Sequence, residues 1–211
     1  MKKTALLAGA TGLVGSALLP LLLASGRYDK VLVVGRRPVA VQHPKLVQVV
    51  TDLGQLEAER LRLIADDVYC CLGTTRQQAG SKEAFYEVDF LYVVRLAAVT
   101  AANFAAQFLV VSAVGAAADS SFYYNKVKGE MEAAVRQTPF RAIHIFRPSL
   151  LLGTRPQPRL GERLGGWVLS LLRPLLRSNW QKYRAITDVA VARAMLQAAQ
   201  ENGSGVRVHE W

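Results

Sequence analysis

Tyr124 and Lys128 stand four residues apart in the stretch "SSFYYNKVKGE", residues 120–130. In an α-helix this spacing places both side chains on one face. A nearby ammonium group stabilises the phenolate form of a tyrosine, which prepares the tyrosine for proton transfer. The same ammonium can donate a hydrogen bond to a ribose hydroxyl. Because chance also supplies this spacing in surface helices, the pair needs support from the rest of the chain.

Ser112 gives part of that support. It follows an apolar run in "QFLVVSA", residues 107–113, and precedes Tyr124 by twelve residues. A strand end and the helix after it can bring the two hydroxyls to one carbonyl oxygen, which Ser112 would polarise while Tyr124 transfers the proton. The alternative is a hydroxyl that ends a strand by bonding to the backbone. We interpret Ser112, Tyr124 and Lys128 as the candidate catalytic set.

The elements that must position these residues alternate between short β-branched runs and longer helical patterns. The chain has 211 residues, which suits one domain. The runs are apolar on both faces, as in central parallel strands. Strands are expected at 4–9, 30–35, 46–50, 67–73, 107–113 and 141–146, and the clearest helices at 83–104, 121–137 and 187–201. This order predicts an α/β protein with a doubly wound, mostly parallel sheet, the Rossmann fold.

The pattern changes after Pro148, and the last helix is expected to begin at Thr187 or Asp188. We predict one dinucleotide-binding domain over 1–211, with a short, irregular C-terminal substrate lobe at 150–186. This lobe is basic and carries Trp167 and Trp180. It could cover an acidic metabolite, contact a nucleic acid or a membrane surface, or be an ordinary solvated lobe.

The stretch "GATGLVG" places glycines at 9, 12 and 15, directly after the first expected strand and at the start of a helix. Glycine permits a tight turn and a close backbone approach, and a helix N-terminus favours an anion. Glycines also cluster simply to close a strand–helix turn, but their place after the first strand favours a pyrophosphate loop.

Arg36 and Arg37 follow the second expected strand, where an acidic residue usually meets the free ribose hydroxyl of NAD. Two guanidinium groups can instead bind a 2′-phosphate, so the sequence predicts NADP(H) in preference to NAD(H). Either arginine could also be an ordinary surface charge. After the third strand, Asp52 and Leu53 could hold the adenine edge, although Asp52 could equally cap a helix.

The composition narrows the class of protein. The net charge of +10 suggests anionic partners, among them phosphorylated cofactors. Cys70 and Cys71 are adjacent and cannot easily form a disulfide, and the histidines have no metal-ligand spacing, so we expect no metal. Residues 1–26 imitate a secretory signal, but Gly and Pro interrupt the apolar stretch. We therefore expect a cytoplasmic protein with no integral membrane segment.

The chain resembles the short-chain dehydrogenase/reductase superfamily in its extended or atypical branch. The landmarks, in order, are "GATGLVG", "VVSAVG", "YNKVK", "FRPSLLLG" and "TDVAVARAM". Within the superfamily, "GRR", "CCLGTTRQQAGSKEAFYEVD", "KVKGEMEA" and "FRPSLLLGTR" are similar to the small Tat-interacting oxidoreductase-like group. The resemblance covers essentially the whole chain.

The resemblance implies further site residues. It places the pyrophosphate on Gly9, Thr11, Gly12, Leu13, Val14 and Gly15. It places the adenosine side of the cofactor at Leu72, Gly73 and Thr74. Against the nicotinamide it places Arg147, Pro148, Ser149 and Leu150. It also implies a homodimer through the helices expected at 83–104 and 121–137.

The sequence departs from the family pattern in two ways, which concern the proton relay and the size of the substrate. The Asn that supports a proton relay in many members is not evident, and Asp89 stands near its place, where it could face the substrate. The C-terminal lobe is shorter than in nucleotide-sugar epimerases and dehydratases, so a large sugar-nucleotide substrate is not expected.

The sequence therefore favours an NADP(H)-dependent oxidoreductase that acts on a small carbonyl or alcohol substrate. The alternative is an NADPH-binding regulatory or scaffold protein with little or no turnover. A nucleic-acid partner is not expected.

Overall fold

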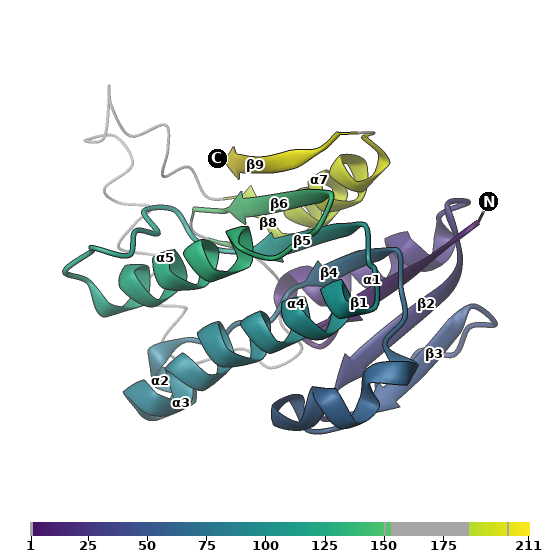
Figure 1. Cartoon of the computed structure of the whole chain (residues 1–211), viewed down its shortest axis with the longest axis horizontal. Helices are drawn as coiled ribbons and strands as arrows, with labels where there is room; N and C mark the ends of the chain where they lie inside the picture. Colours follow the sequence, from purple (N-terminus) through teal and green to yellow (C-terminus); the bar gives the residue numbers. More distant parts are fainter. Residues whose placement is uncertain (1, 150, 153–185, 202) are drawn as a thin grey trace.

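The computed structural model describes residues 2–149, 151–152, 186–201 and 203–211. Its main sheet has seven strands in the order β3-β2-β1-β4-β5-β6-β9. All neighbouring strands in this sheet are parallel, so their arrows point the same way in Figure 1. The strands are β1 (Lys3–Ala8), β2 (Tyr28–Gly35), β3 (Leu46–Val50), β4 (Asp67–Cys70), β5 (Gln107–Val111), β6 (Ala142–Arg147) and β9 (Gly205–Glu210). The carboxyl ends of these strands therefore form one edge of the sheet.

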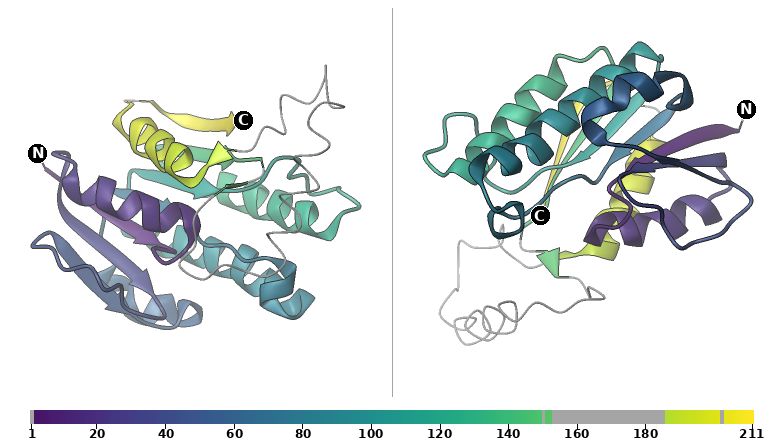
Figure 2. Two further views of the ribbon diagram at one scale, coloured as in Figure 1. Left: turned by 180° about the vertical axis from the view of Figure 1, so that it is seen from behind. Right: turned by 90° about the horizontal axis from the view of Figure 1, so that it is seen from below.

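The helices connect successive strands and cover both faces of the sheet. They are α1 (Leu13–Ala24), the 3₁₀ helix η1 (Leu53–Arg62), α2 (Arg76–Ala79), α3 (Lys82–Tyr86), the π-helical turn η2 (Glu87–Leu91), α4 (Tyr92–Ala102), α5 (Tyr123–Arg136) and α7 (Asp188–Gln200). A small parallel pair is formed by β7 (Leu151–Leu152) and β8 (Ile186–Thr187). Seen from behind, α1 and α7 lie together on the face opposite α4 and α5 (Figure 2).

Each face has its own apolar core, because successive side chains of a strand point to opposite faces. One core joins β-strand residues such as Leu6, Val68 and Phe108 to α4 and α5. The other joins Leu7 and Leu109, with their neighbours, to α1 and α7. This arrangement is the doubly wound fold expected from the sequence, and the fold prediction is confirmed.

The six expected strands are all present, with changes only at their ends. The helix expected at 83–104 is divided into α3, the π-helical turn η2 and α4, an interruption that the apolar periodicity does not indicate. Thr187 caps α7, because its side chain accepts a hydrogen bond from the backbone N–H of Ala190. The seventh strand, β9, was not predicted. Most of the lobe expected at 150–186, including Trp167 and Trp180, lies outside the described residues and stays a prediction.

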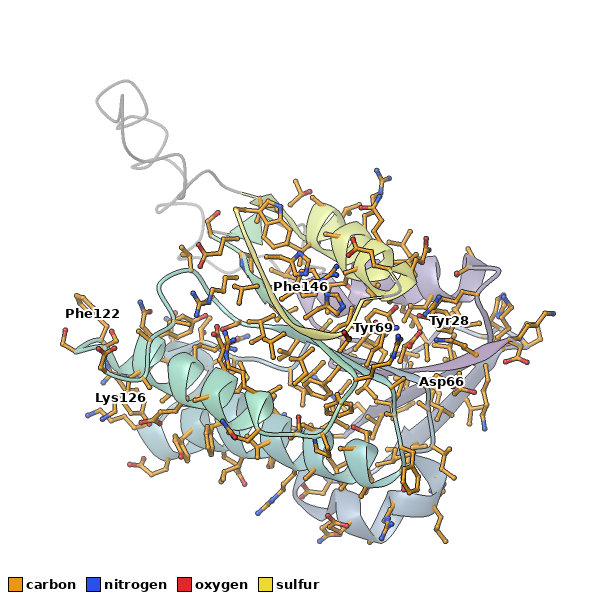
Figure 3. The ribbon with its side chains drawn as sticks, turned by 45° about the horizontal axis from the view of Figure 1, so that its top comes forward. Tyr28, Asp66, Tyr69, Phe122, Lys126 and Phe146 are labelled. Carbon is orange, nitrogen blue, oxygen red and sulfur yellow. The ribbon has the colours of Figure 1, made fainter. Side chains whose placement is uncertain are left out.

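A buried polar cluster marks the end of the sheet opposite the carboxyl edge. Asp67 is fully buried there and accepts hydrogen bonds from Arg27, Tyr28 and Gln107. Figure 3 shows Tyr28, Tyr69 and Asp66 toward this end, whereas Phe122 and Lys126 lie at the far end, where α5 begins. The cluster is therefore distant from the edge where the candidate site lies. In the described part of the chain, no helix is long and apolar enough to cross a membrane.

Candidate functional site

The glycine loop joins β1 to α1 at the carboxyl edge. Gly9 has a φ of 84°, and a Cβ there would meet the carbonyl oxygen of Cys71 at 2.4 Å. A Cβ on Gly15 would lie 2.1 Å from the carbonyl oxygen of Gly9. Both positions thus require glycine, the first for conformation and the second for space. Among the described residues, no side chain caps the N-terminus of α1, which begins after Gly12, so this helix end is suited to an anion.

A cleft of about 910 Å³ opens beside this loop, within the usual size range of cofactor sites. Of the predicted residues, those lining it are Gly9, Thr11, Gly12, Leu13, Arg36, Arg37, Leu53, Leu72, Gly73 and Thr74. Val14 is buried in the core shared with α1, so this residue and Gly15 support the loop from behind.

The cleft also contains residues that the sequence did not reveal. Ser16, Val39, Gln78, Glu87 and Tyr92 contribute to its wall. Tyr92 is a helical apolar residue by pattern and gave no signal of a site. Asp52 takes the cap role, because its side chain accepts a hydrogen bond at 2.8 Å from the backbone N–H of Gly54.

Lys128 lies directly behind the wall of this cleft. Its side chain is 4% exposed and its ammonium nitrogen is 2.7 Å from Oδ1 of the fully buried Asp89. A Cβ on Gly73 would lie 3.4 Å from that oxygen and 3.6 Å from the ammonium nitrogen. The other Asp89 oxygen accepts a hydrogen bond at 2.8 Å from the backbone N–H of Thr74. The expectation that Asp89 faces the substrate is therefore wrong, because its carboxylate is buried and contacts Lys128 and Thr74 inside the protein.

Several neighbours determine the charge state of Lys128. Burial lowers the pKa of its ammonium, but the Asp89 carboxylate and, to a smaller extent, Tyr124 and Cys70 raise it, and the net effect is a raised pKa. Burial also raises the pKa of the Cys70 thiol to about 12, so this thiol is not a nucleophile at neutral pH.

The two adjacent tyrosines at the start of α5 have different environments. The hydroxyl of Tyr123 donates a hydrogen bond at 3.0 Å to the backbone carbonyl of Lys82, which ties α5 to α3. Tyr124 is 39% exposed, and its ring packs on Phe85 with the ring centroids 5.6 Å apart. Only Tyr124 thus shares the helix face of Lys128 and also presents itself to solvent.

The Ser112 hydroxyl, which the sequence suggested would polarise a substrate carbonyl, is bonded to a side chain of the protein. The Ser112 side chain is buried, and its hydroxyl donates a 2.6 Å hydrogen bond to Oε1 of Glu132 on α5. Glu132 is 2% exposed and also accepts two hydrogen bonds from Arg147, at 2.9 and 2.7 Å. Arg147 in turn donates to Glu210 of β9 at 2.8 Å. To polarise a carbonyl, the Ser112 hydroxyl would have to leave Glu132.

Arg147 begins the segment 147–150, which is predicted to contact the nicotinamide. Its guanidinium is engaged with two carboxylates, which raise its pKa. The Pro148 carbonyl accepts a hydrogen bond from the backbone N–H of Val114, and Ser149 is buried. Leu150 lies outside the described residues. Contact of these four residues with a nicotinamide stays a prediction.

The sequence did not predict that Glu132 would bind Ser112 and Arg147, or that Asp89 would pair with Lys128. Glu132 follows Lys128 by four positions and so lies on the same inward face of α5, beside the buried Met131 and Val135. An acidic residue among the buried positions of a helix is a signal of a buried ion pair, and this signal was available in the sequence.

A family model described as "NAD dependent epimerase/dehydratase family" matches residues 5–208. The chain belongs to this family. The predicted place in the extended branch of the short-chain dehydrogenase/reductase superfamily is thus confirmed.

Curated relatives agree with the narrower resemblance. Protein HTATIP2 of Rattus norvegicus is 35% identical over 207 residues, which is 96% of this chain and 84% of the relative. Protein FMP52, mitochondrial, of Eremothecium gossypii is 30% identical over 210 residues, which is 98% of this chain and 93% of the relative. The first places the chain with the Tat-interacting oxidoreductase-like group.

Solved structures support the fold. The Bordetella bronchiseptica enzyme WbmH, determined in complex with NAD⁺, superposes with a TM-score of 0.76 at 15% identity, over 100% of this chain and 76% of that one. MoeE5, determined in complex with UDP-glucose and NAD, gives a TM-score of 0.72 at 20% identity, over 98% of this chain and 76% of that one.

Proposed function

We propose that this protein is an NADP(H)-dependent oxidoreductase of the short-chain dehydrogenase/reductase type, acting on a small carbonyl or alcohol compound. The observation that carries the proposal is the placement of Lys128 behind Gly73, in the wall of a cleft that also contains the glycine loop. Tyr124 lies one helical turn from Lys128 on the same helix face, which supports a role for Tyr124 in proton transfer at this site.

The cleft residues fit a dinucleotide by their chemistry. The glycine loop and the uncapped start of α1 would hold the pyrophosphate. Arg36 and Arg37 line the cleft beyond β2, where they would bind a 2′-phosphate. The preference for NADP(H) over NAD(H) rests on these two guanidinium groups and on the absence of an acidic residue at their positions.

In the reductive direction, Tyr124 would donate its hydroxyl proton to the carbonyl oxygen and recover a proton from solvent. A nicotinamide dinucleotide, when bound, would supply the hydride with its two electrons. Lys128 would hold a ribose hydroxyl and stabilise charge on the Tyr124 oxygen. The role of Ser112 as the group that polarises the carbonyl stays a prediction, because its hydroxyl must first exchange Glu132 for substrate.

The test combines binding with turnover. NADPH should raise the melting temperature of the purified protein more than NADH does, and NADPH should be consumed with some member of a panel of small aldehydes, ketones and quinones. Tyr124→Phe should retain NADPH binding and lose most of this turnover. Tyr123→Phe is the matched control and should keep it, because the Tyr123 hydroxyl only contacts the Lys82 carbonyl. Failure of NADPH to bind would refute the proposal at its first step.

The second candidate is an NADPH-binding regulatory or scaffold protein with little or no turnover. It is favoured by one observation, the hydrogen bond of the Ser112 hydroxyl to buried Glu132 rather than to a group in the cleft. Turnover that disappears in Tyr124→Phe would reject this candidate. A cytoplasmic location and a homodimer also stay predictions; some of the relatives are named mitochondrial.

A further inference from the structure

Asp89 is an acid with no assigned role in the proposed reaction, yet its carboxylate contacts Lys128 of the candidate catalytic set. It is fully buried, and it occupies the middle of the π-helical turn η2. A π-helical turn shifts the side chains that follow it relative to an α-helix, and such turns are frequent at functional sites. Here the turn directs a carboxylate between the cleft wall and α5.

The two oxygens of Asp89 contact two different parts of the site. One lies 2.7 Å from the Lys128 ammonium on α5. The other accepts the backbone N–H of Thr74, which belongs to the loop after β4 and lines the cleft. One carboxylate therefore joins the cofactor wall to the helix that carries Tyr124.

We propose that Asp89 is a positioning residue. Its carboxylate holds the Lys128 ammonium, in its charged form, against the Gly73–Thr74 wall of the cleft. From there the ammonium would donate a hydrogen bond to a ribose hydroxyl of the bound dinucleotide. This inference rests on the proposed function, because it concerns the same site. A lysine that is 4% exposed and has no carboxylate beside it would be costly to keep charged.

Within the described part of the chain, three titratable groups act on the Lys128 ammonium. They are Asp89 on η2, Cys70 on β4 and Tyr124 on α5 itself. The Cys70 thiol stays neutral near neutral pH because burial raises its pKa to about 12. Asp89 is thus the neighbour whose negative charge offsets the burial of the ammonium.

The consequence is a specific pH dependence of cofactor binding. With Asp89 present, Lys128 stays protonated well above neutral pH, so NADPH affinity should change less than about twofold between about pH 7 and about pH 9. In Asp89→Asn the burial of Lys128 is no longer offset and its pKa falls. The affinity should then decrease by about tenfold over the same range as the ammonium loses its proton.

The experiment measures NADPH dissociation constants by calorimetry across this pH range for four proteins. These are the wild type, Asp89→Asn, Lys128→Met and the double variant. Lys128→Met and the double variant should both bind weakly and with no pH dependence, which assigns the decrease in Asp89→Asn to Lys128. Glu130→Gln is the matched control for removal of a carboxylate, because Glu130 lies on the helix that carries Lys128 but does not line the cleft, and its affinity should not fall with pH.

Two results would overturn the inference. One is an Asp89→Asn variant whose NADPH affinity is as independent of pH as that of the wild type. The other is a wild-type affinity that already decreases below about pH 9, which would show that Asp89 does not keep Lys128 charged. The wild-type measurement decides the matter even if Asp89→Asn does not fold. A wild type that binds no NADPH at neutral pH would instead refute the proposed function.

Discussion

Replacing Glu132 with Gln should destabilise the protein strongly, although Glu132 touches neither cleft nor solvent. The change keeps the side-chain shape but removes the negative charge between Arg147 and Ser112. The Arg147 guanidinium would then face an amide, and one of its hydrogen bonds would meet a donor instead of an acceptor. Removing one partner of a buried ion pair commonly costs about 3–5 kcal/mol.

The magnitude should be smaller in this case. The Arg147 side chain is 21% exposed and keeps its contact with Glu210, so part of its charge remains compensated. We expect a loss of about 2–3 kcal/mol in the free energy of unfolding. For a chain of this length that corresponds to a melting temperature lower by about 5–10 °C.

The assay is urea unfolding followed by circular dichroism, with Glu130→Gln as the matched control. Glu130 lies on the same helix, but its contact with Lys126 spans 4.0 Å between side chains that are 32% and 51% exposed, so its loss should cost less than about 0.5 kcal/mol. The double variant Glu132→Gln/Arg147→Met should recover part of the stability, because it removes the guanidinium that has lost its buried carboxylate. Equal stability of Glu132→Gln and Glu130→Gln would refute the reasoning.

Three further predictions concern the cofactor loop, cofactor choice and pH. Gly15→Ala should weaken NADPH binding by at least about tenfold, because its Cβ would overlap the Gly9 carbonyl, whereas Gly26→Ala has space and should not; calorimetry measures both. Arg36→Ala/Arg37→Ala should reduce affinity for NADPH by about tenfold more than affinity for NADH, and equal losses would contradict the 2′-phosphate assignment. His144 is buried, and its pKa is lowered to about 4, below the unfolded value of about 6.5. Burial is the main cause, and the charge of nearby His209 is the second. The contribution of His144 to stability is therefore present above about pH 6.5 and lost as the pH falls toward 4; unfolding measured against pH should show a smaller acid loss in His144→Phe than in the wild type.

The fold could be predicted because its determinants are local. Strands such as Leu46–Val50 are short apolar runs bounded by polar residues, and the glycine loop stands where β1 must turn into α1. The cofactor wall followed from the same logic, since parallel strands place their carboxyl ends together.

The unpredicted features depend on contacts between distant residues. The last strand, β9, has mostly exposed side chains, so its apolar pattern is weak and its pairing with β6 is what makes it a strand. The position of Asp89 depends on one π-helical turn inside a longer helix, a change of register that hydrophobic periodicity does not encode. The Ser112 hydroxyl was assigned from spacing alone, and spacing gave no information about Glu132, which competes for it.

The pairing of Arg147 with Glu210 also has a consequence for how the protein is made. The two residues are 63 positions apart, and Glu210 belongs to the strand that follows every other strand of the sheet. During synthesis, α5 and β6 leave the ribosome long before β9 does. The ionic network around Ser112 is then completed only when β9 has joined the sheet. Nascent chains arrested before residue 205 should therefore hold an Arg147–Glu132 pair that still lacks its outer carboxylate.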